Sequence, residues 1–125
     1  MPEEAEGLRG GQLHAAISNS VVRIVAEYTG RGPTKARTVM GADSVFVVLE
    51  DTMTKGERTL VENGEHDAVL DLRRRWQRAM REDLSNEVER LTGRSVIGFM
   101  SDNHIDPDLG VEIFILDSTE EPTEA

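Results

Sequence analysis

Cysteine is absent from this sequence of 125 residues. Its absence excludes disulfides, cysteine-ligated zinc, iron–sulfur clusters and a thiol nucleophile. Apolar runs are also short, since the longest, Val45 to Leu49, has the length of a strand, whereas a membrane-spanning helix needs about 20 apolar residues. The amino terminus lacks a basic region followed by an apolar stretch, so no signal peptide is expected. A soluble, cytoplasmic chain is therefore the expectation.

Basic residues are the minority, since Lys and Arg number 14 against 24 Asp and Glu, a formal net charge of −10. Much of this excess lies in two glutamate-rich tails, residues 1–10 and 118–125, whose composition is typical of disordered, solubilising segments. Residues 11–117 are then expected to form the single domain that this length accommodates. Such an acidic chain is a poor non-specific ligand for nucleic acid or anionic lipid.

Hydrophobic periodicity predicts a helix, a hairpin and a short helix in the first half of the domain. Apolar residues recur every three or four positions over 13–28. Strands are expected at 37–40 and 44–49 around a glycine-containing loop. The sequence Thr-Lys-Gly-Glu at 54–57 matches the capping box that begins a helix, here expected to end at about residue 62.

The second half predicts a longer helix and another hairpin. Apolar steps of three and four residues run from Val69 to Leu91, and Gly93 is the natural helix stop. Strands are expected at 96–100 and 111–116, and the last, nearly all apolar, is expected to be central and covered on both faces. Together these elements predict a two-layer α+β fold, with a four-stranded, mainly antiparallel sheet and two main helices plus one short helix on one face.

The two halves resemble each other. The tripeptide Thr-Gly-Arg at 29–31 recurs at 92–94, an offset of 63 residues, and Asp51 and Asp117 follow the apolar strands at an offset of 66. A duplicated α-β-β unit explains these matches. So does the general likeness of any two units that share helix-stop glycines and apolar strands, and both explanations stay open.

A positive segment follows the first helix, because no acidic residue occurs between Glu27 and Asp43. Guanidinium and ammonium groups complement an anion or an acidic partner, and glycines let the backbone approach it closely. The candidate binding residues are Gly30, Arg31, Gly32, Thr34, Lys35 and Arg37. The alternative is a helix cap, a proline turn and a strand whose charges face water, since the dipole at a helix C-terminus disfavours anions.

An acidic loop is expected at 101–108, between the last two strands. Hard oxygen ligands suit Mg²⁺ or Ca²⁺, and an imidazole beside a carboxylate suits a transition metal. The candidate ligands are Asp102, His104, Asp106 and Asp108. The spacing does not match an EF-hand, and Asn, Asp and Pro are also the residues that a hairpin turn uses, which is the favoured interpretation.

Five arginines lie on the expected long helix: Arg73, Arg74, Arg75, Arg78 and Arg81. A nucleic-acid surface would need more aromatic residues for base stacking than this chain offers. The favoured interpretation is a solvated helix face with weak ion pairs to acids such as Asp71 and Glu82.

Three segments together resemble the MpsC-like family, long catalogued as a domain of unknown function: AISNSVVRIVAEYTGRGPTKARTVM, DTMTKGERTLVENG and MSDNHIDPDLGVEIFIL. The resemblance extends from about Gly11 to Leu116. The family's name refers to a Na⁺-translocating, membrane-potential-generating system, later linked to inorganic carbon uptake. The resemblance implies a small soluble accessory factor rather than the translocating subunit, and it carries over no catalytic residue.

These observations favour a non-enzymatic accessory or regulatory module that binds an anion or acidic partner at Gly30–Arg37. Its expected partners are a membrane protein of a Na⁺-translocating or inorganic-carbon uptake system and a second copy, in a homodimer formed by a sheet edge or helix face. Motifs such as G-x-S-x-G and H-E-x-x-H are absent, and no cofactor is assigned. Two alternatives stay open: a metal-dependent enzyme that uses Asp102–Asp108, and a nucleic-acid-binding protein.

Overall fold

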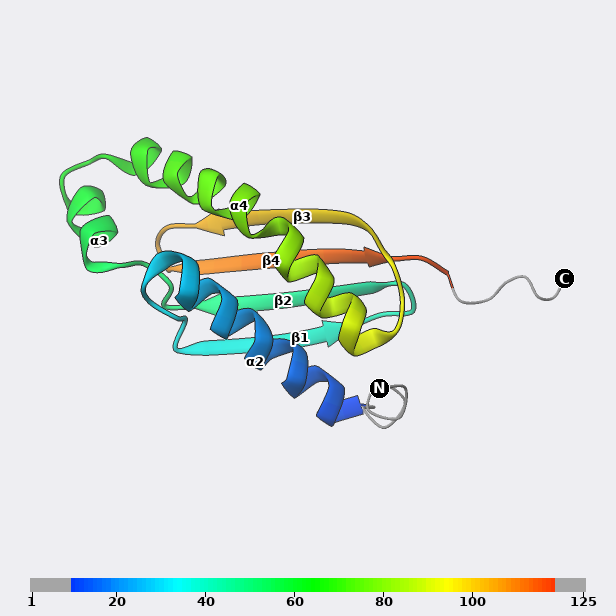
Figure 1. Cartoon of the computed structure of the whole chain (residues 1–125). Helices are drawn as coiled ribbons and strands as arrows, with labels where there is room; N and C mark the ends of the chain where they lie inside the picture. The colour runs from blue at the N-terminus through cyan, green and yellow to red at the C-terminus, as the bar shows by residue number, and fades with distance from the viewer. Residues whose placement is uncertain (1–9, 119–125) are drawn as a thin grey trace, which may run out of the picture.

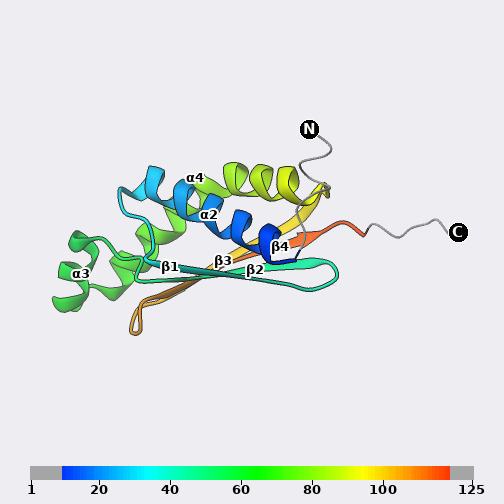
Figure 2. The same ribbon diagram turned by 90° about the horizontal axis from the view of Figure 1, so that it is seen from below.

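An antiparallel sheet of four strands forms one layer of the structure, and two long helices form the other (Figures 1 and 2). The computed structural model describes residues 10–118, so the expected tails lie outside the described residues apart from Gly10 and Ser118. The elements follow in the order α2 (Gly10–Thr29), β1 (Lys35–Met40), β2 (Ser44–Glu50), α3 (Lys55–Glu62), α4 (His66–Thr92), β3 (Val96–His104) and β4 (Leu109–Leu116). Figure 2 places α2 and α4 on the same side of the sheet, which confirms the predicted two-layer α+β fold.

The hydrophobic core lies between the long helices and the sheet. α2 buries Ile17, Val21 and Ile24, whose spacing places them on one side of the helix. The matching stripe of α4 is Met80, Leu84, Val88 and Leu91. Both stripes pack on alternate residues of the central strands: Val45, Val47, Leu49, Phe114 and Leu116. The apolar periodicity of the sequence thus identified the buried side of each long helix.

β2 and β4 are the central strands, because the sheet order is β1-β2-β4-β3. This order confirms the central position predicted for the last strand. The prediction that both its faces are covered is wrong for the described residues, since α2 and α4 cover only the face on which Phe114 and Leu116 are buried. Ile113 and Ile115 alternate with them and lie partly exposed on the other side. We call this uncovered side of the sheet the open face.

The second hairpin is longer, and its turn tighter, than the sequence predicted. β3 continues past Met100 to His104 because residues 101–104 pair with β4. Only residues 105–108 form the turn, so half of the expected loop is strand. Asp and Asn have low strand propensity, but the main-chain hydrogen bonds of a neighbouring strand override it. β1 likewise begins at Lys35, two residues earlier than predicted, opposite Glu50.

The tripeptide Thr-Gly-Arg ends both long helices in the same way. The Thr29 and Thr92 hydroxyls donate to carbonyls four residues earlier, at 2.9 and 2.8 Å. Gly30 and Gly93 take the left-handed conformation, with φ of 84° and 73°, which glycine adopts without a steric penalty. The chain can therefore leave each helix abruptly and return toward the sheet.

The arginine of each tripeptide then ties its helix end to the end of a strand. Arg31 Nη2 donates to the Asp51 carbonyl at 3.1 Å, and Arg94 Nη2 donates to the Asp117 carbonyl at 2.5 Å. Asp51 and Asp117 are the aspartates that the sequence comparison paired. The same α-β-β arrangement with the same internal tie is thus present twice, which favours duplication over the alternative of a general likeness.

Phe114→Ala is expected to lower the free energy of unfolding by about 3–5 kcal/mol, because it opens a cavity in the core. Phe114 is fully buried and stacks at a tilt on Phe99, with ring centroids 5.3 Å apart. Urea denaturation followed by circular dichroism measures the loss. As a control, Leu60→Ala on the exposed side of α3 should cost less than about 1 kcal/mol. Equal losses in the two variants would contradict the assigned core.

Candidate functional site

Three segments that are far apart in the sequence meet at the end of the sheet nearest α3 (Figure 1). They are the loop after α2, the β3–β4 turn and the connection from β2 to α3. The Asp51 amide in the connection donates to the Asp108 carbonyl in the turn at 3.1 Å, and Arg31 from the loop pairs with Asp51. The positive segment and the acidic loop predicted from the sequence are therefore neighbours in the fold.

Asp51 is the centre of this meeting point. Its carboxylate pairs with Arg31 at 2.7 Å and with Arg58. The hydrogen bond from Arg31, and to a lesser extent that from Thr34, lowers the pKa of Asp51. Its φ of 59° lies in the left-handed region, which Asp tolerates better than most residues. The chain turns here from β2 toward α3, and the two guanidinium groups hold the turn.

Asp108 secures the same connection from the opposite side. Its Oδ1 accepts from the Thr52 hydroxyl and its Oδ2 from the Met53 amide, both at 2.8 Å. Arg58 lies 3.7 Å from Oδ2. The carboxylate thus satisfies groups of the β2–α3 connection, and its side chain points into the protein rather than into the solvent.

A buried ion pair between Arg73 of α4 and Glu57 of α3 lies next to these groups. Arg73 donates to the Glu57 carboxylate from Nε at 2.7 Å and from Nη2 at 2.9 Å, and its Nη1 donates to the Thr52 hydroxyl at 2.7 Å. Glu57 also accepts from the Thr54 amide at 2.8 Å, within the predicted capping box, which the structure confirms. Two-point contacts between guanidinium and carboxylate are among the stronger polar interactions in proteins.

We call the whole cluster the ionic junction; its members are Arg31, Asp51, Thr52, Glu57, Arg58, Arg73 and Asp108. The prediction that Arg73 is one of the solvated arginines is wrong, because its side chain is buried in the ionic junction. A signal was present, because Arg73 lies four residues after Val69 and three before Trp76, on the apolar stripe of its helix. An arginine on a buried stripe needs a buried carboxylate.

The predicted anion-binding residues are divided between two places. Arg31 points into the ionic junction, and Gly32 packs against α2, where an added Cβ would lie 3.3 Å from Ala26. Lys35 and Arg37 instead project from β1 on the open face, where both are exposed. Gly30 comes directly before Arg31 at the end of α2, and Thr34, which hydrogen-bonds to Asp51, is the last residue before β1. The six residues thus do not surround one common point.

The predicted metal ligands are likewise divided. Asp102 and His104 lie exposed on β3, whereas Asp108 points into the ionic junction. His104 Nδ1 is 2.8 Å from the Pro107 carbonyl oxygen, a contact within the turn, and Asp106 is exposed beside it. Over residues 10–118, no three His, Asp or Glu side chains are grouped as they would be around a metal ion.

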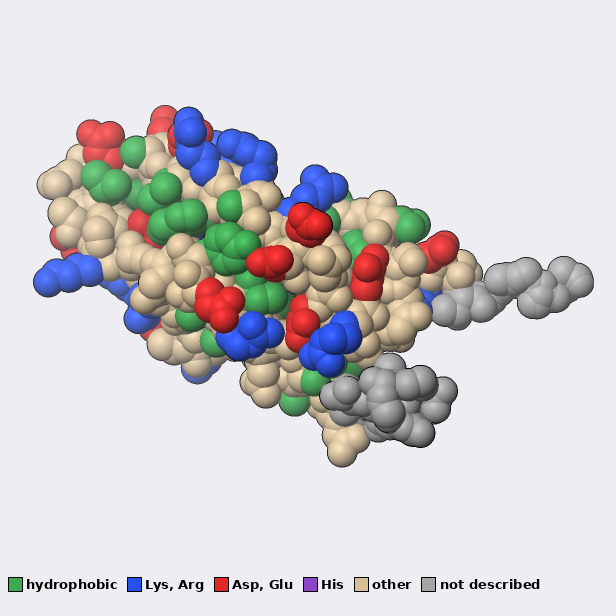
Figure 3. Space-filling view, viewed as in Figure 1, with side chains coloured by type: hydrophobic (Ala, Val, Ile, Leu, Met, Phe, Trp, Pro, Cys, Tyr) green, Lys and Arg blue, Asp and Glu red, His purple; other side chains and the backbone are tan. Residues whose placement is uncertain are grey.

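The remaining arginines of α4 lie on its exposed side. Arg75 pairs with Asp71 at 3.0 Å, as the sequence predicted. Arg74, Arg78 and Arg81 line a shallow groove along the helix, and the Arg81 guanidinium lies 5.8 Å from the centre of the Phe99 ring. Figure 3 shows acidic and basic side chains interspersed over this helix-covered side of the molecule.

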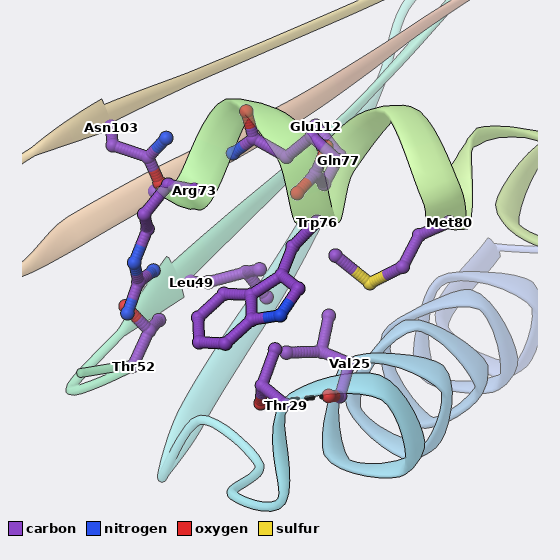
Figure 4. A pocket seen from close by; sticks show the side chains of 11 residues that line it. Val25, Thr29, Leu49, Thr52, Arg73, Trp76, Gln77, Met80, Asn103 and Glu112 are labelled. Atoms are coloured by element: carbon purple, nitrogen blue, oxygen red, sulfur yellow. Dashed lines mark hydrogen bonds between the residues drawn. The ribbon is translucent and has the colours of Figure 1, made fainter. Parts of the chain in front are cut away.

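Glu112 is buried on the helix-covered side of β4, next to a small pocket that has Trp76 at its centre (Figure 4). Within the described part of the chain no donor reaches its Oε1. Burial raises the pKa of Glu112 to about 7, although the Ser101 hydroxyl and the Arg73 charge act in the opposite direction. The one hint in the sequence is that a single acid interrupts the apolar run of residues 109–116.

The sequence was compared with models of known protein families, and one of them matches most of the chain. A family model described as "Na+-translocating membrane potential-generating system (MpsC)" matches residues 9–118. The chain belongs to the MpsC family. No curated protein and no solved structure matches it significantly. Between residues 10 and 118, none of the helices combines the length and the apolar character that crossing a membrane requires.

Arg73→Met is expected to destabilise this MpsC-family chain strongly, because the charge of Glu57 then stays buried without its partner. The free energy of unfolding should fall by about 3–5 kcal/mol, as measured by urea denaturation. Arg75→Met is the matched control, since it breaks only the exposed pair with Asp71 and should cost less than about 1 kcal/mol. Similar losses in both variants would show that the ionic junction contributes no more than a surface pair.

Glu112→Gln is expected to remove a pH dependence of stability. The pKa of Glu112 is about 7 in the folded protein against an ordinary 4.5, so the folded state keeps the proton where the unfolded state releases it. The contribution of Glu112 to the free energy of unfolding is therefore fully present below pH 4.5. It falls by on the order of 3 kcal/mol as the pH rises through 7.

Urea denaturation at about pH 5 and about pH 8 tests this sign. The wild type should lose stability between the two values, and Glu112→Gln should lose markedly less. Glu62→Gln, at the exposed end of α3, serves as the control and should follow the wild type. Parallel behaviour of wild type and Glu112→Gln would contradict a raised pKa at this position.

Proposed function

We propose that this chain is a non-enzymatic accessory or regulatory module of a Na⁺-translocating, membrane-potential-generating system. It acts on the cytoplasmic side, binds an anion or an acidic partner through Gly30–Arg37, and self-associates as a homodimer. The family description supports the link to such a system. A membrane subunit of a Na⁺-translocating or inorganic-carbon uptake system is the expected partner.

The observation that carries the binding role is the environment of Lys35 and Arg37. Both side chains are exposed on the edge strand β1, two residues apart on the same face. In residues 10–118 neither has a carboxylate within ion-pair distance, whereas Arg31 is paired with Asp51. Arg37 lies opposite the apolar Val48, whereas Lys35 lies opposite Glu50 on the same face. Exposed cations that form no ion pair, in a chain of net charge −10, complement a negative group from outside.

The ionic junction supports binding rather than catalysis. Its carboxylates, Asp51, Glu57 and Asp108, each accept from groups that hold the β2–α3 connection or the start of α3. A general acid or base must instead face a substrate with a free lone pair or proton. Arg31 then serves the binding segment indirectly, because it fixes the loop from which β1 begins.

The double substitution Lys35→Ala with Arg37→Ala is expected to reduce binding by about tenfold or more, since it removes both exposed cations. The full tagged chain is mixed with detergent-solubilised native membranes, and captured integral membrane subunits are quantified by mass spectrometry. Calorimetric titration with phosphate, bicarbonate and ATP reports separately on small anions. Circular dichroism should show an unchanged fold, because neither side chain is buried within its own chain.

Arg74→Ala with Arg78→Ala is the matched control, because it removes the same charge from the exposed side of α4. This control should bind like the wild type. If Lys35→Ala with Arg37→Ala also binds like the wild type in both assays, the assignment to Gly30–Arg37 is overturned.

A further inference from the structure

The open face is more apolar than the water-facing side of an antiparallel sheet normally is. Its most exposed large apolar residues are Val39 (50%), Phe46 (39%), Ile97 (66%) and Met100 (51%). Between them, Ile113 and Ile115 of β4 are partly exposed. No described helix lies on this side (Figure 2). A contiguous apolar patch left uncovered in this way marks an interaction surface.

The strand register arranges the open face in rows that cross all four strands. One row consists of Arg37, Val48, Val111 and Asp102, and the next of Val39, Phe46, Ile113 and Met100. Directly paired residues of antiparallel strands project from the same face, so each row is a line of neighbouring side chains. The first row carries a cation at the β1 edge and an anion at the β3 edge.

We propose that a second copy of this chain covers the open face. The two copies are related by a two-fold axis that lies midway between their facing sheets, parallel to the strands and above the boundary between β2 and β4. Rotation about this axis exchanges the edges of the sheet, so β1 of one protomer lies over β3 of the other. Each row then faces the same row of the second protomer in reverse order. Arg37 faces Asp102 of the partner subunit, and Phe46 faces Ile113 of the partner subunit.

Charge complementarity selects a second copy as the occupant. Within one protomer Arg37 and Asp102 are three strand spacings apart, about 14 Å, so they cannot pair with each other. Across the two-fold axis they meet twice, and the dimer leaves neither charge without a partner. This inference rests on the proposed function and deepens it, because it identifies the acidic partner of Arg37 as Asp102 of another copy.

The packing of such a dimer follows known sheet geometry. Facing sheets lie about 10 Å apart with their strands aligned within about 30°, the arrangement that a two-fold axis parallel to the strands produces. Phe46 and Ile113 then form a dry centre, and the Arg37–Asp102 pairs flank it. β4 becomes covered on both faces, which accounts for a strand whose two sides are both apolar.

Charge reversal tests the pairing directly. Arg37→Asp places two acids together and Asp102→Arg places two bases together, so each is expected to raise the dimer dissociation constant by about tenfold or more. The double variant, Arg37→Asp with Asp102→Arg, restores opposite charges and should return the constant to within about threefold of the wild type. Sedimentation velocity over a concentration series measures all three, and circular dichroism checks that each variant folds.

The control is Arg74→Asp, a charge reversal on the exposed side of α4, which should leave the dimer unchanged. A wild type that stays monomeric at high micromolar concentration overturns both the dimer and this interface. A dimer that withstands both single reversals overturns the interface but leaves self-association through another surface. Two weakened single variants without rescue in the double variant overturn the proposed axis.

The absence of native cysteine permits a second, independent test. The axis places Val39 over Met100 of the partner subunit, so separately purified Val39→Cys and Met100→Cys chains are mixed and treated with a short bismaleimide. A covalent heterodimer is expected, and Arg74→Cys mixed with Met100→Cys should give none. Equal cross-linking in both mixtures overturns the proposed arrangement.

Discussion

The antiparallel pairing of β2 with β4 is the constraint on which the rest of the structure depends. It joins the two α-β-β halves through their most apolar strands, with Val45 opposite Phe114 at the base of the core. The same register brings Asp108 beside Thr52 and so creates the ionic junction. It also sets Arg37 and Asp102 at opposite edges of one row. The core, the ionic junction and the proposed interface thus all depend on the pairing of β2 with β4.

The ionic junction shows how an acidic chain uses its few cations. Arg31, Arg58 and Arg73 each pair with a carboxylate that comes from a different segment. The Arg73–Glu57 pair is the buried one, and because a buried pair loses hydration, its main effect is to fix how α3 fits against α4. The cations left over for external contact are those whose strand or helix directs them away from this cluster.

Local patterns in the sequence predicted most of the secondary structure but only part of the site. Helix stripes, the capping box at 54–57 and the central position of the last strand follow from spacing and composition, which act over a few residues. The length of β3 depends on its pairing with β4 across the turn, and the inward direction of Arg73 and Asp108 depends on neighbours more than 15 residues away. Secondary-structure propensity contains no information on such contacts, because the fold sets where the contacting residue lies.

The sequence by itself determined the fold class, the repeated Thr-Gly-Arg helix ends and the existence of a positive segment between Glu27 and Asp43. These features depend on backbone preference and on hydrophobic periodicity, both of which are local. Only the tertiary structure decided which cations are neutralised and which face outward, and which side of the sheet is left uncovered. Electrostatic pairing and burial depend on distances through space, and those distances exist only after the two halves have joined.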